Sequence, residues 1–368
     1  MSAKSRTKLG ILIGVLIIII VAGAYGYQYY TELGTSASMQ TSQTAMQTVS
    51  ETIASTTASP LILYSADAYV LESSALASAF TSSTGIMVAP PKGGGSLLLA
   101  RQISQGNPVS VFIAVSRSAM QPTYLGNQSS GWAIAFASDQ MVLAYSNSTS
   151  QNSAAASVLN EYNVATSSNS TQAWANFYNG LTSGGVKVGI GDPNADPAGF
   201  RAWIVLEAAS NVYSSGNFFV NRMITNKGNV TGASAADLIA PLETGQIQFL
   251  FIYKSAAIAH NLNYLQLADG VNLGHPAYSS FYSQFSYQLA KGPQKGGLIA
   301  LYITVPADST DTANSLQFVV FVVKNYQTVL SPFGLAPMTP PKLYNSTTVP
   351  QPIQELVSQG YLKYSGTL

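Results

Sequence analysis

The chain has 368 residues, of which 47% are hydrophobic, so it can bury a core in one large or two medium-sized domains. It has no cysteine, which excludes disulfides and thiolate chemistry, and its net charge of +1 gives no general attraction for nucleic acid, which we exclude as a partner. Only 8% of the residues are charged, so hydroxyl and amide side chains must solvate the surface, as suits a protein outside the cytoplasm. Five Asn-x-Ser/Thr sequons are compatible with glycosylation or with chance: Asn127, Asn147, Asn169, Asn229 and Asn345.

The N-terminal segment, residues 1–30, is predicted to be a signal or membrane anchor. Basic residues in MSAKSRTK precede an uncharged apolar run from Leu9 to Gly26, and no basic cluster follows it. The positive-inside rule therefore places the N-terminus in the cytoplasm and the rest of the chain outside, attached to the cell membrane. Cleavage stays open, because Ala22-Gly23-Ala24 suits a conventional cut and Lys4-Ser5 resembles a pilin-type signal.

Residues 31–60 are dominated by Ser, Thr, Ala and Gln and contain almost no large apolar side chains. Such a segment cannot bury enough surface to fold. It is predicted to be a linker that holds the following domain away from the membrane.

From residue 61 onward, short apolar runs alternate with helix-like stretches, which predicts an α/β fold. Strands are expected at 61–64, 86–90, 109–115, 136–145, 186–191, 247–253, 263–267 and 298–305. Helices are expected at 69–83, 96–105 and 312–330. Runs that are apolar on both faces favour parallel-rich sheets covered on two sides.

Two strand ends carry residues suited to binding a ligand, because ligands of open α/β sheets lie beyond the carboxyl ends of strands. The first strand is followed by Ser65 and Asp67, although Asp67 is equally explained as a helix cap. In PPKGGGSLLLARQI (90–103), glycines up to Gly95 allow close backbone approach, Lys92 adds a positive charge and Ser96 starts a helix, which suits an oxyanion. A turn followed by a helix cap is an alternative interpretation of the same residues.

A third candidate is the loop in GIGDPNADPAGFRAWIVLEAAS (189–210), which joins a strand to a helix beginning near Ala198. Asp196 is expected to cap that helix, and Arg201 lies one turn further on. The two Asp-Pro pairs are explained by turns, but a turn alone does not require Gly199 and Arg201 beside them.

Read in order, these segments resemble the archaeal tungstate/molybdate-binding subfamily of the periplasmic-type solute-binding proteins of ABC importers. DPNADPAGFR (192–201) is similar to that family's D-P-x-x-D-P-C-G-Y-R, and PLETGQIQFLFIYKSAAIAHNLNYLQL (241–267) to its later L-E-x-G-E-L-D-Y-A-F-E-Y-R-S-V-A segment. FASDQMVLAY (136–145) looks like its hinge strand, and the similarity covers about residues 61 to 340.

The resemblance implies a two-lobed, type II periplasmic-binding-protein-like fold with an oxyanion between the lobes. Lobe 1 is predicted at 61–140 and 305–368 and lobe 2 at 141–304, closing on the ligand by a hinge motion. With the strand-end serine, the implied ligand-binding residues are Ser65, Ala66, Asp67, Gly95, Ser96, Asp196, Pro197, Ala198, Glu243 and Tyr264.

The chain also departs from that pattern. The family's Gly-Ser is Ala66-Asp67, where a carboxylate would repel a dianion unless it is protonated or turned away. The later glutamates fall at Gln246 and Ile252, which leaves Glu243 as the only carboxylate of that segment. The resemblance therefore supports the architecture of the fold more than the identity of the ligand.

The remaining motifs give no sign of catalysis. His260 and His275 have no partner at metal-ligand spacing, and no nucleophile elbow occurs, so we expect neither an enzyme nor a metal or cofactor site. The main hypothesis is an extracellular receptor that delivers tungstate or molybdate to an ABC transporter permease. Two alternatives stay open: the same fold binding a sugar, peptide or other organic solute, and a surface protein without a transport role.

Overall fold

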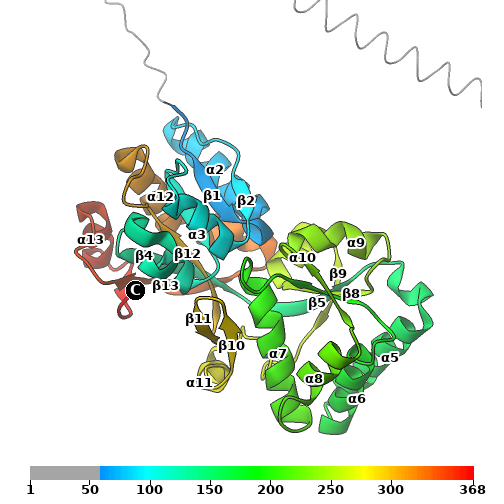
Figure 1. Cartoon of the computed structure of the whole chain (residues 1–368). Coiled ribbons are helices and arrows are strands. Elements are labelled where there is room, and N and C mark those ends of the chain that lie inside the picture. Colours follow the sequence, from blue (N-terminus) through cyan, green and yellow to red (C-terminus); the bar gives the residue numbers. More distant parts are fainter. Residues whose placement is uncertain (1–58) are drawn as a thin grey trace, which may run out of the picture. The chain divides into compact units, whose positions relative to one another are not determined.

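The computed structural model describes residues 59–368, which belong to one compact unit, 58–368. The predicted anchor at 1–30 and nearly all of the predicted linker at 31–60 lie outside the described residues. Among the helices from residue 59 onward, none combines the length and the apolar character needed to cross a bilayer. The described residues form two α/β lobes, each built around its own sheet (Figure 1).

The first lobe is built on a mixed seven-stranded sheet. In spatial order its strands are β14 (Lys363–Tyr364), β13 (Ala336–Asn345), β4 (Trp132–Asp139), β12 (Ile299–Thr304), β3 (Val111–Ala114), β1 (Leu63–Ala66) and β2 (Lys92–Gly94). Strand β1 pairs in parallel with both β2 and β3, whereas β12 is antiparallel to β3 and β4. The parallel part places the ends of β1 and β2 at the same edge.

Helices cover this sheet because their apolar stripes need a partner surface. They are α2 (Val70–Thr84), α3 (Ser96–Ser104), α4 (Pro122–Leu125), α12 (Thr312–Leu330) and α13 (Gln351–Ser358). Phe80 of α2 packs edge-on against Phe318 and Phe321 of α12, with ring centroids 5.1 and 5.5 Å away. Helix α12 has the bounds that its apolar spacing predicts, and Asp311 caps its first turn.

The second lobe is built on a five-stranded sheet in the order β7 (Asn229–Gly232), β6 (Val188–Gly191), β8 (Phe249–Tyr253), β5 (Met141–Tyr145) and β9 (Asn263–Gln266). Its helices are α5 (Ser153–Ser168), α6 (Thr171–Leu181), α7 (Pro197–Tyr213), α8 (Phe218–Thr225), α9 (Ile239–Glu243) and α10 (Lys254–Ala259). An aromatic cluster around Trp174 ties α5, α6 and α7 together, since its ring lies against Tyr162, Phe177 and Tyr213.

Two crossings connect the lobes. The first is at Gln140, between β4 and β5. The second runs from β9 through α11 (Ser279–Tyr282) and the hairpin β10 (Ser286–Leu289)–β11 (Gly292–Lys295) to β12. Figure 1 shows this hairpin between the first sheet and α7. Short 3-10 turns complete the elements: η1 (Asp67–Tyr69), η2 (Arg117–Met120), η3 (Gly126–Gln128), η4 (Thr149–Gln151), η5 (Ala236–Leu238), η6 (Pro276–Tyr278) and η7 (Ser331–Phe333).

The structure corrects three expectations. The sheets are mixed rather than parallel-rich, because both crossings bring antiparallel strands into them. Residues 86–90 form only a bridge from Val88 to Leu61, and the neighbouring edge strand is β2. Residues 299–304, expected in lobe 2, are β12 of the first sheet, so the second boundary precedes Ile299.

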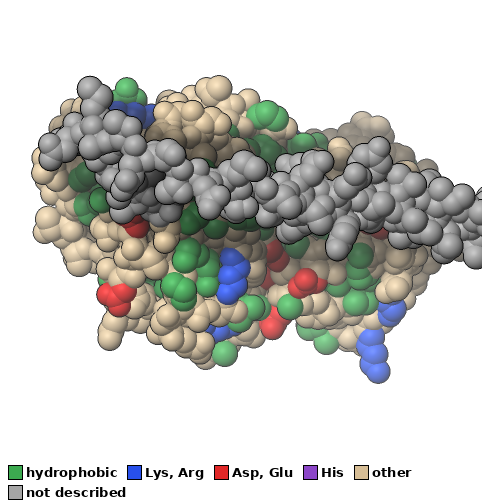
Figure 2. Space-filling view, turned by 90° about the horizontal axis from the view of Figure 1, so that it is seen from above, with side chains coloured by type: hydrophobic (Ala, Val, Ile, Leu, Met, Phe, Trp, Pro, Cys, Tyr) green, Lys and Arg blue, Asp and Glu red, His purple; other side chains and the backbone are tan. Residues whose placement is uncertain are grey.

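The surface reflects the low charge content. Figure 2 shows lysine, arginine and carboxylate side chains scattered thinly among uncharged ones on the face seen from above.

Candidate functional site

The ends of β1 and β2 lie side by side, as the sequence predicts. Ser65 is paired with Gly93 and Ala66 with Gly94, and the chain then continues through Gly95 into α3. The hydroxyl of Ser65 is buried and bonds the carbonyls of Ala66 and Tyr69 and the hydroxyl of Ser73. It is therefore engaged within the first lobe.

The Asp-Pro loop of the second lobe faces these strand ends. Asp196 caps α7, accepting a hydrogen bond from the N–H of Ala198 at 2.9 Å and another from Ala235 at 2.8 Å. Pro197 occupies the first position of the helix, where its fixed φ angle and missing N–H are tolerated. The predicted cap is thus confirmed, and Asp196, Pro197 and Ala198 are all buried.

The two segments are in direct contact. A Cβ atom on Gly95 would lie 2.3 Å from the carbonyl oxygen of Ala195, so only glycine permits this approach. That oxygen accepts hydrogen bonds from the N–H groups of Leu97 and Leu98 at 3.1 and 3.3 Å. The start of α3, which the sequence predicts as an oxyanion site, is occupied here by backbone of the other lobe. The hydroxyl of Ser96 accepts from the N–H of Val115 at 3.2 Å, within its own lobe.

Two carboxyl groups interact at this junction. Burial, together with the smaller effect of the charge of Asp67, raises the pKa of Asp196 to about 7. Burial also raises the pKa of Asp67, with Asp237 adding to the effect and hydrogen bonds from Ser234 and Ala68 opposing it. Since like charges in low-dielectric surroundings repel, the contact is most favourable when one of the two carries a proton.

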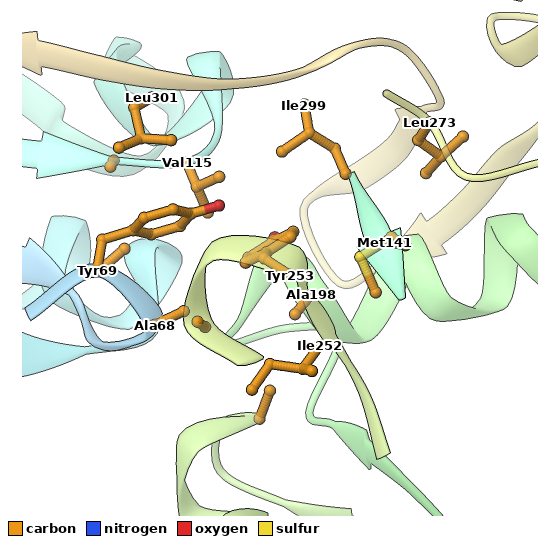
Figure 3. Close-up of a cluster of buried hydrophobic side chains, with 14 of the residues drawn as sticks. Ala68, Tyr69, Val115, Met141, Ala198, Ile252, Tyr253, Leu273, Ile299 and Leu301 are labelled. Atoms are coloured by element: carbon orange, nitrogen blue, oxygen red, sulfur yellow. The ribbon is translucent and has the colours of Figure 1, made fainter. Parts of the chain in front are cut away.

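Behind this junction, polar side chains are buried among apolar ones from both lobes. Tyr69 of the first lobe stacks on Tyr253 of the second, with ring centroids 5.4 Å apart. The hydroxyls of Tyr69 and Ser255 donate to Asp139 at 3.0 and 2.6 Å. Figure 3 shows the two tyrosines within the cluster that joins the lobes. Burial raises the pKa of Asp139 to about 6, against the opposing effect of these hydrogen bonds.

Arg201 links the lobes across the same cluster. Its guanidinium donates to the carbonyl of Val115, in the first lobe, at 2.6 Å and to the hydroxyl of Tyr253 at 2.7 Å. Both acceptors are neutral. Neither hydrogen bond therefore neutralises the positive charge of the guanidinium.

Glu72, on α2, is the most unusual buried group. It is 1% exposed, and neither carboxylate oxygen has a hydrogen-bond partner among the described residues. Burial, together with the smaller effect of the charge of Asp139, raises its pKa to about 7. A carboxylate without hydrogen-bond partners is costly to bury, so burial favours the protonated form of Glu72.

Beside this cluster lies a cavity of about 630 Å³, which we call the cationic cleft. Its walls come from η2, α4, β12 and β13 of the first lobe and from α7 and the β10–β11 hairpin. Five basic residues line it, namely Arg117, Arg201, Lys291, Lys295 and Lys342, and no carboxylate from the described part of the chain does so. The net charge of the chain is only +1, so this concentration is local.

Aromatic rings share the walls with these cations. Arg117 lies over the ring of Tyr344 at 4.9 Å, and Tyr344 is 6.1 Å from the ring of Tyr302. At the hairpin, the Lys291 ammonium lies 4.9 Å from the ring of Tyr124 and donates to the carbonyl of Thr123. The cleft therefore offers positive charge and flat apolar surface together.

Two predicted site residues do not join this arrangement. Glu243 is exposed at the last position of α9. Tyr264 lies on the edge strand β9, paired with Ala144, and its neighbour is Tyr162 of α5. The resemblance implied both residues as ligand-binding, but the structure places neither of them at the lobe junction.

The cationic cleft itself was missed by the sequence analysis. Arg117 follows β3 as Asp67 follows β1, so the strand-end rule was available for it. The letters KGPQKGG (291–297) signal a turn, but nothing in them indicates that its lysines face another lobe. Lys342 lies on β13, directly after the prolines of PFGLAPMTPP (332–341), where no strand was expected.

Comparison with known proteins agrees with this architecture. Residues 61–334 match the family of bacterial extracellular solute-binding proteins. An uncharacterized solute-binding protein of Sulfurisphaera tokodaii is 38% identical over 317 residues, 83% of either chain, and one of Saccharolobus solfataricus is 35% identical over 83% of this chain and 78% of its own.

Among solved structures, the periplasmic molybdate-binding protein of Azotobacter vinelandii superposes with a TM-score of 0.52 at 16% identity, over 75% of this chain and 98% of its own. That likeness concerns the fold. The match to the family model and the level of identity to the archaeal relatives show that this chain belongs to the bacterial extracellular solute-binding protein family.

Proposed function

We propose that this chain captures an oxyanion in the cleft between its lobes and hands it to the permease of an ABC-type importer. It acts as a binding protein and makes or breaks no bond. The observation that carries the proposal is the cationic cleft, with five basic side chains and no carboxylate from the described residues in its walls. Such a site attracts anions and repels cations.

The contacts between the lobes explain how capture would work. Arg201 and the Ala195 carbonyl bind groups of the first lobe from the second, so they act only when the lobes are closed. A ligand that touches both walls stabilises the closed form by its own contacts. Opening frees the N–H groups of Leu97 and Leu98, which then offer a second place for an anion.

Tungstate and molybdate are the inorganic oxyanions that we propose to test first. The similarity of the Asp-Pro loop to the tungstate/molybdate-binding subfamily supports them, and so does the fold shared with a molybdate-binding protein. We also propose that the apolar run from Leu9 to Gly26 anchors the body to the outer side of the cell membrane.

The test is titration calorimetry on the full-length chain with tungstate, molybdate, sulfate and phosphate. We expect binding that weakens as salt is added and is at least about tenfold weaker in Arg117→Gln, because one charge near the anion is lost. Lys324→Gln is the matched control, since Lys324 lies over the ring of Tyr361, outside the cleft, at 5.1 Å. Absence of heat with every anion, organic ones included, would contradict the proposal.

A further inference from the structure

The cationic cleft is larger than a bare tetrahedral oxyanion needs. A water-sized atom takes about 30 Å³ in a condensed phase, so five heavy atoms fill at most roughly 150 Å³. The cavity is about 630 Å³. Volumes in this range are typical of sites for organic molecules, which are about 300–1,000 Å³.

The positive charges are also distributed over separate elements. Arg117 and Lys342 belong to the first lobe, Arg201 lies in α7 of the second, and Lys291 and Lys295 belong to the hairpin. The charges therefore come from the first lobe, the second lobe and the hairpin that connects them. A molecule with anionic groups at two points can engage the first lobe and the hairpin at once.

Flat apolar surface lies between these charges. Tyr302 and Tyr344, both half-buried, contribute it from the first sheet. An inorganic oxyanion gains nothing from such rings, because its own surface is polar in every direction. A carbon skeleton packs on them and is held in one orientation.

From volume, charge distribution and aromatic walls together, we infer that the ligand of the cationic cleft is an organic anion that carries phosphate or carboxylate groups at two separated points. This inference rests on the proposed function, since it presumes capture of an anion between the lobes. Bare oxyanions then occupy only one of the charged subsites and bind more weakly.

The test compares probes that differ in their organic part. Full-length protein is titrated with inorganic phosphate, tungstate, citrate, fructose 1,6-bisphosphate and fructose. We expect citrate or fructose 1,6-bisphosphate to bind at least about tenfold tighter than phosphate or tungstate, which is a gain of about 1.4 kcal/mol. Fructose, which has no charge, gives no binding.

Variants of the walls sharpen the comparison. Tyr344→Leu removes a ring from the cleft, so it should weaken binding of the organic anion more than binding of phosphate. Tyr344→Phe keeps the ring and should not have this effect. Tyr361→Leu removes the matched ring beneath Lys324, outside the cleft, and should change neither affinity. A thermal unfolding curve for each variant reports whether it has folded.

The outcomes separate the two proposals. If tungstate, molybdate or phosphate binds as tightly as both organic anions and Tyr344→Leu affects all of them equally, the inference is wrong and the proposed function stands. If no anion binds, whether inorganic or organic, both are wrong. If fructose binds as well as its bisphosphate, charge does not select the ligand and both fail as well.

Discussion

The carbonyl oxygen of Ala195, in the second lobe, accepts a hydrogen bond from the N–H of Leu97, in the first turn of α3, at 3.1 Å. Helix starts carry unpaired N–H groups that a capping side chain, water or an anion usually satisfies. Here the opposing lobe supplies the acceptor, so closure itself caps the helix. The junction is therefore sensitive to any atom that prevents close approach.

Gly95→Ala tests this sensitivity. The added Cβ would lie 2.3 Å from the Ala195 oxygen, so the lobes must separate or shift, at a cost of about 1–3 kcal/mol. We expect weaker anion binding by calorimetry and a larger radius of gyration by X-ray scattering. Gly270→Ala is the control, because its Cβ meets only the Tyr278 ring at 3.8 Å. Unchanged affinity and size in Gly95→Ala would show that the contact is dispensable.

Arg201→Lys tests the link between α7 and the first lobe. A lysine cannot donate simultaneously to the Val115 carbonyl and the Tyr253 hydroxyl in the geometry of a guanidinium. We expect the free energy of unfolding to fall by about 2–4 kcal/mol in denaturant titration. Arg222→Lys should cost less, because its guanidinium makes one long bond of 3.4 Å to Asn179. Equal losses in the two variants would argue against a special role for Arg201.

The buried carboxyl groups predict a stability that depends on pH. Glu72, Asp139 and Asp196 have pKa values raised to about 7, 6 and 7, each above its usual value near 4. A group whose pKa is raised in the folded state contributes its full stabilisation below the unfolded pKa and loses it as pH rises through the folded pKa. We expect the melting temperature to fall between about pH 4 and pH 7, measured with calorimetry in buffers of equal ionic strength.

Glu72→Gln isolates one of these groups. The amide resembles the protonated acid, so stability should change little at pH 4 and rise at pH 8 by up to about 3 kcal/mol, the free energy of a pKa raised from 4.5 to about 7. Glu355→Gln, at an exposed position of α13, is the control and should leave the pH profile unchanged. A loss of stability that is the same at pH 4 and pH 8 would show that Glu72 acts by shape and not by its proton.

Asp67→Asn tests the coupling across the junction. Removing the charge of Asp67 removes one of the causes that raise the pKa of Asp196, which should then lie below about 7. Carboxyl-carbon NMR titration of labelled protein measures this directly. Asp308→Asn, which removes the charge of a carboxyl group that accepts from Gln128 at the surface, should leave the titration of Asp196 in place. An unshifted Asp196 in the Asp67 variant would mean that the two groups do not interact.

Much of the fold was predictable from local pattern. The apolar spacing that predicts a helix at 312–330 corresponds to α12, and Asp196 caps α7 as its position before Pro197 indicates. Residues 136–145, which look like a hinge strand on the resemblance alone, are parts of β4 and β5 with Gln140 between them. A strand that changes sheets has the same alternation as one that does not, so periodicity alone could not reveal the crossing.

The candidate site was likewise predictable from the sequence only in part. By itself the sequence determined which residues end strands and begin helices, because caps, glycines and prolines act on their immediate neighbours. Only the tertiary structure decided that Ala195 occupies the start of α3, and that Lys291 and Arg117 line one cleft. It also decided that Glu72 is buried with no hydrogen-bond partner in the part of the chain that the structure describes. Burial and charge proximity depend on elements far apart in the chain, and no local pattern encodes which of them meet.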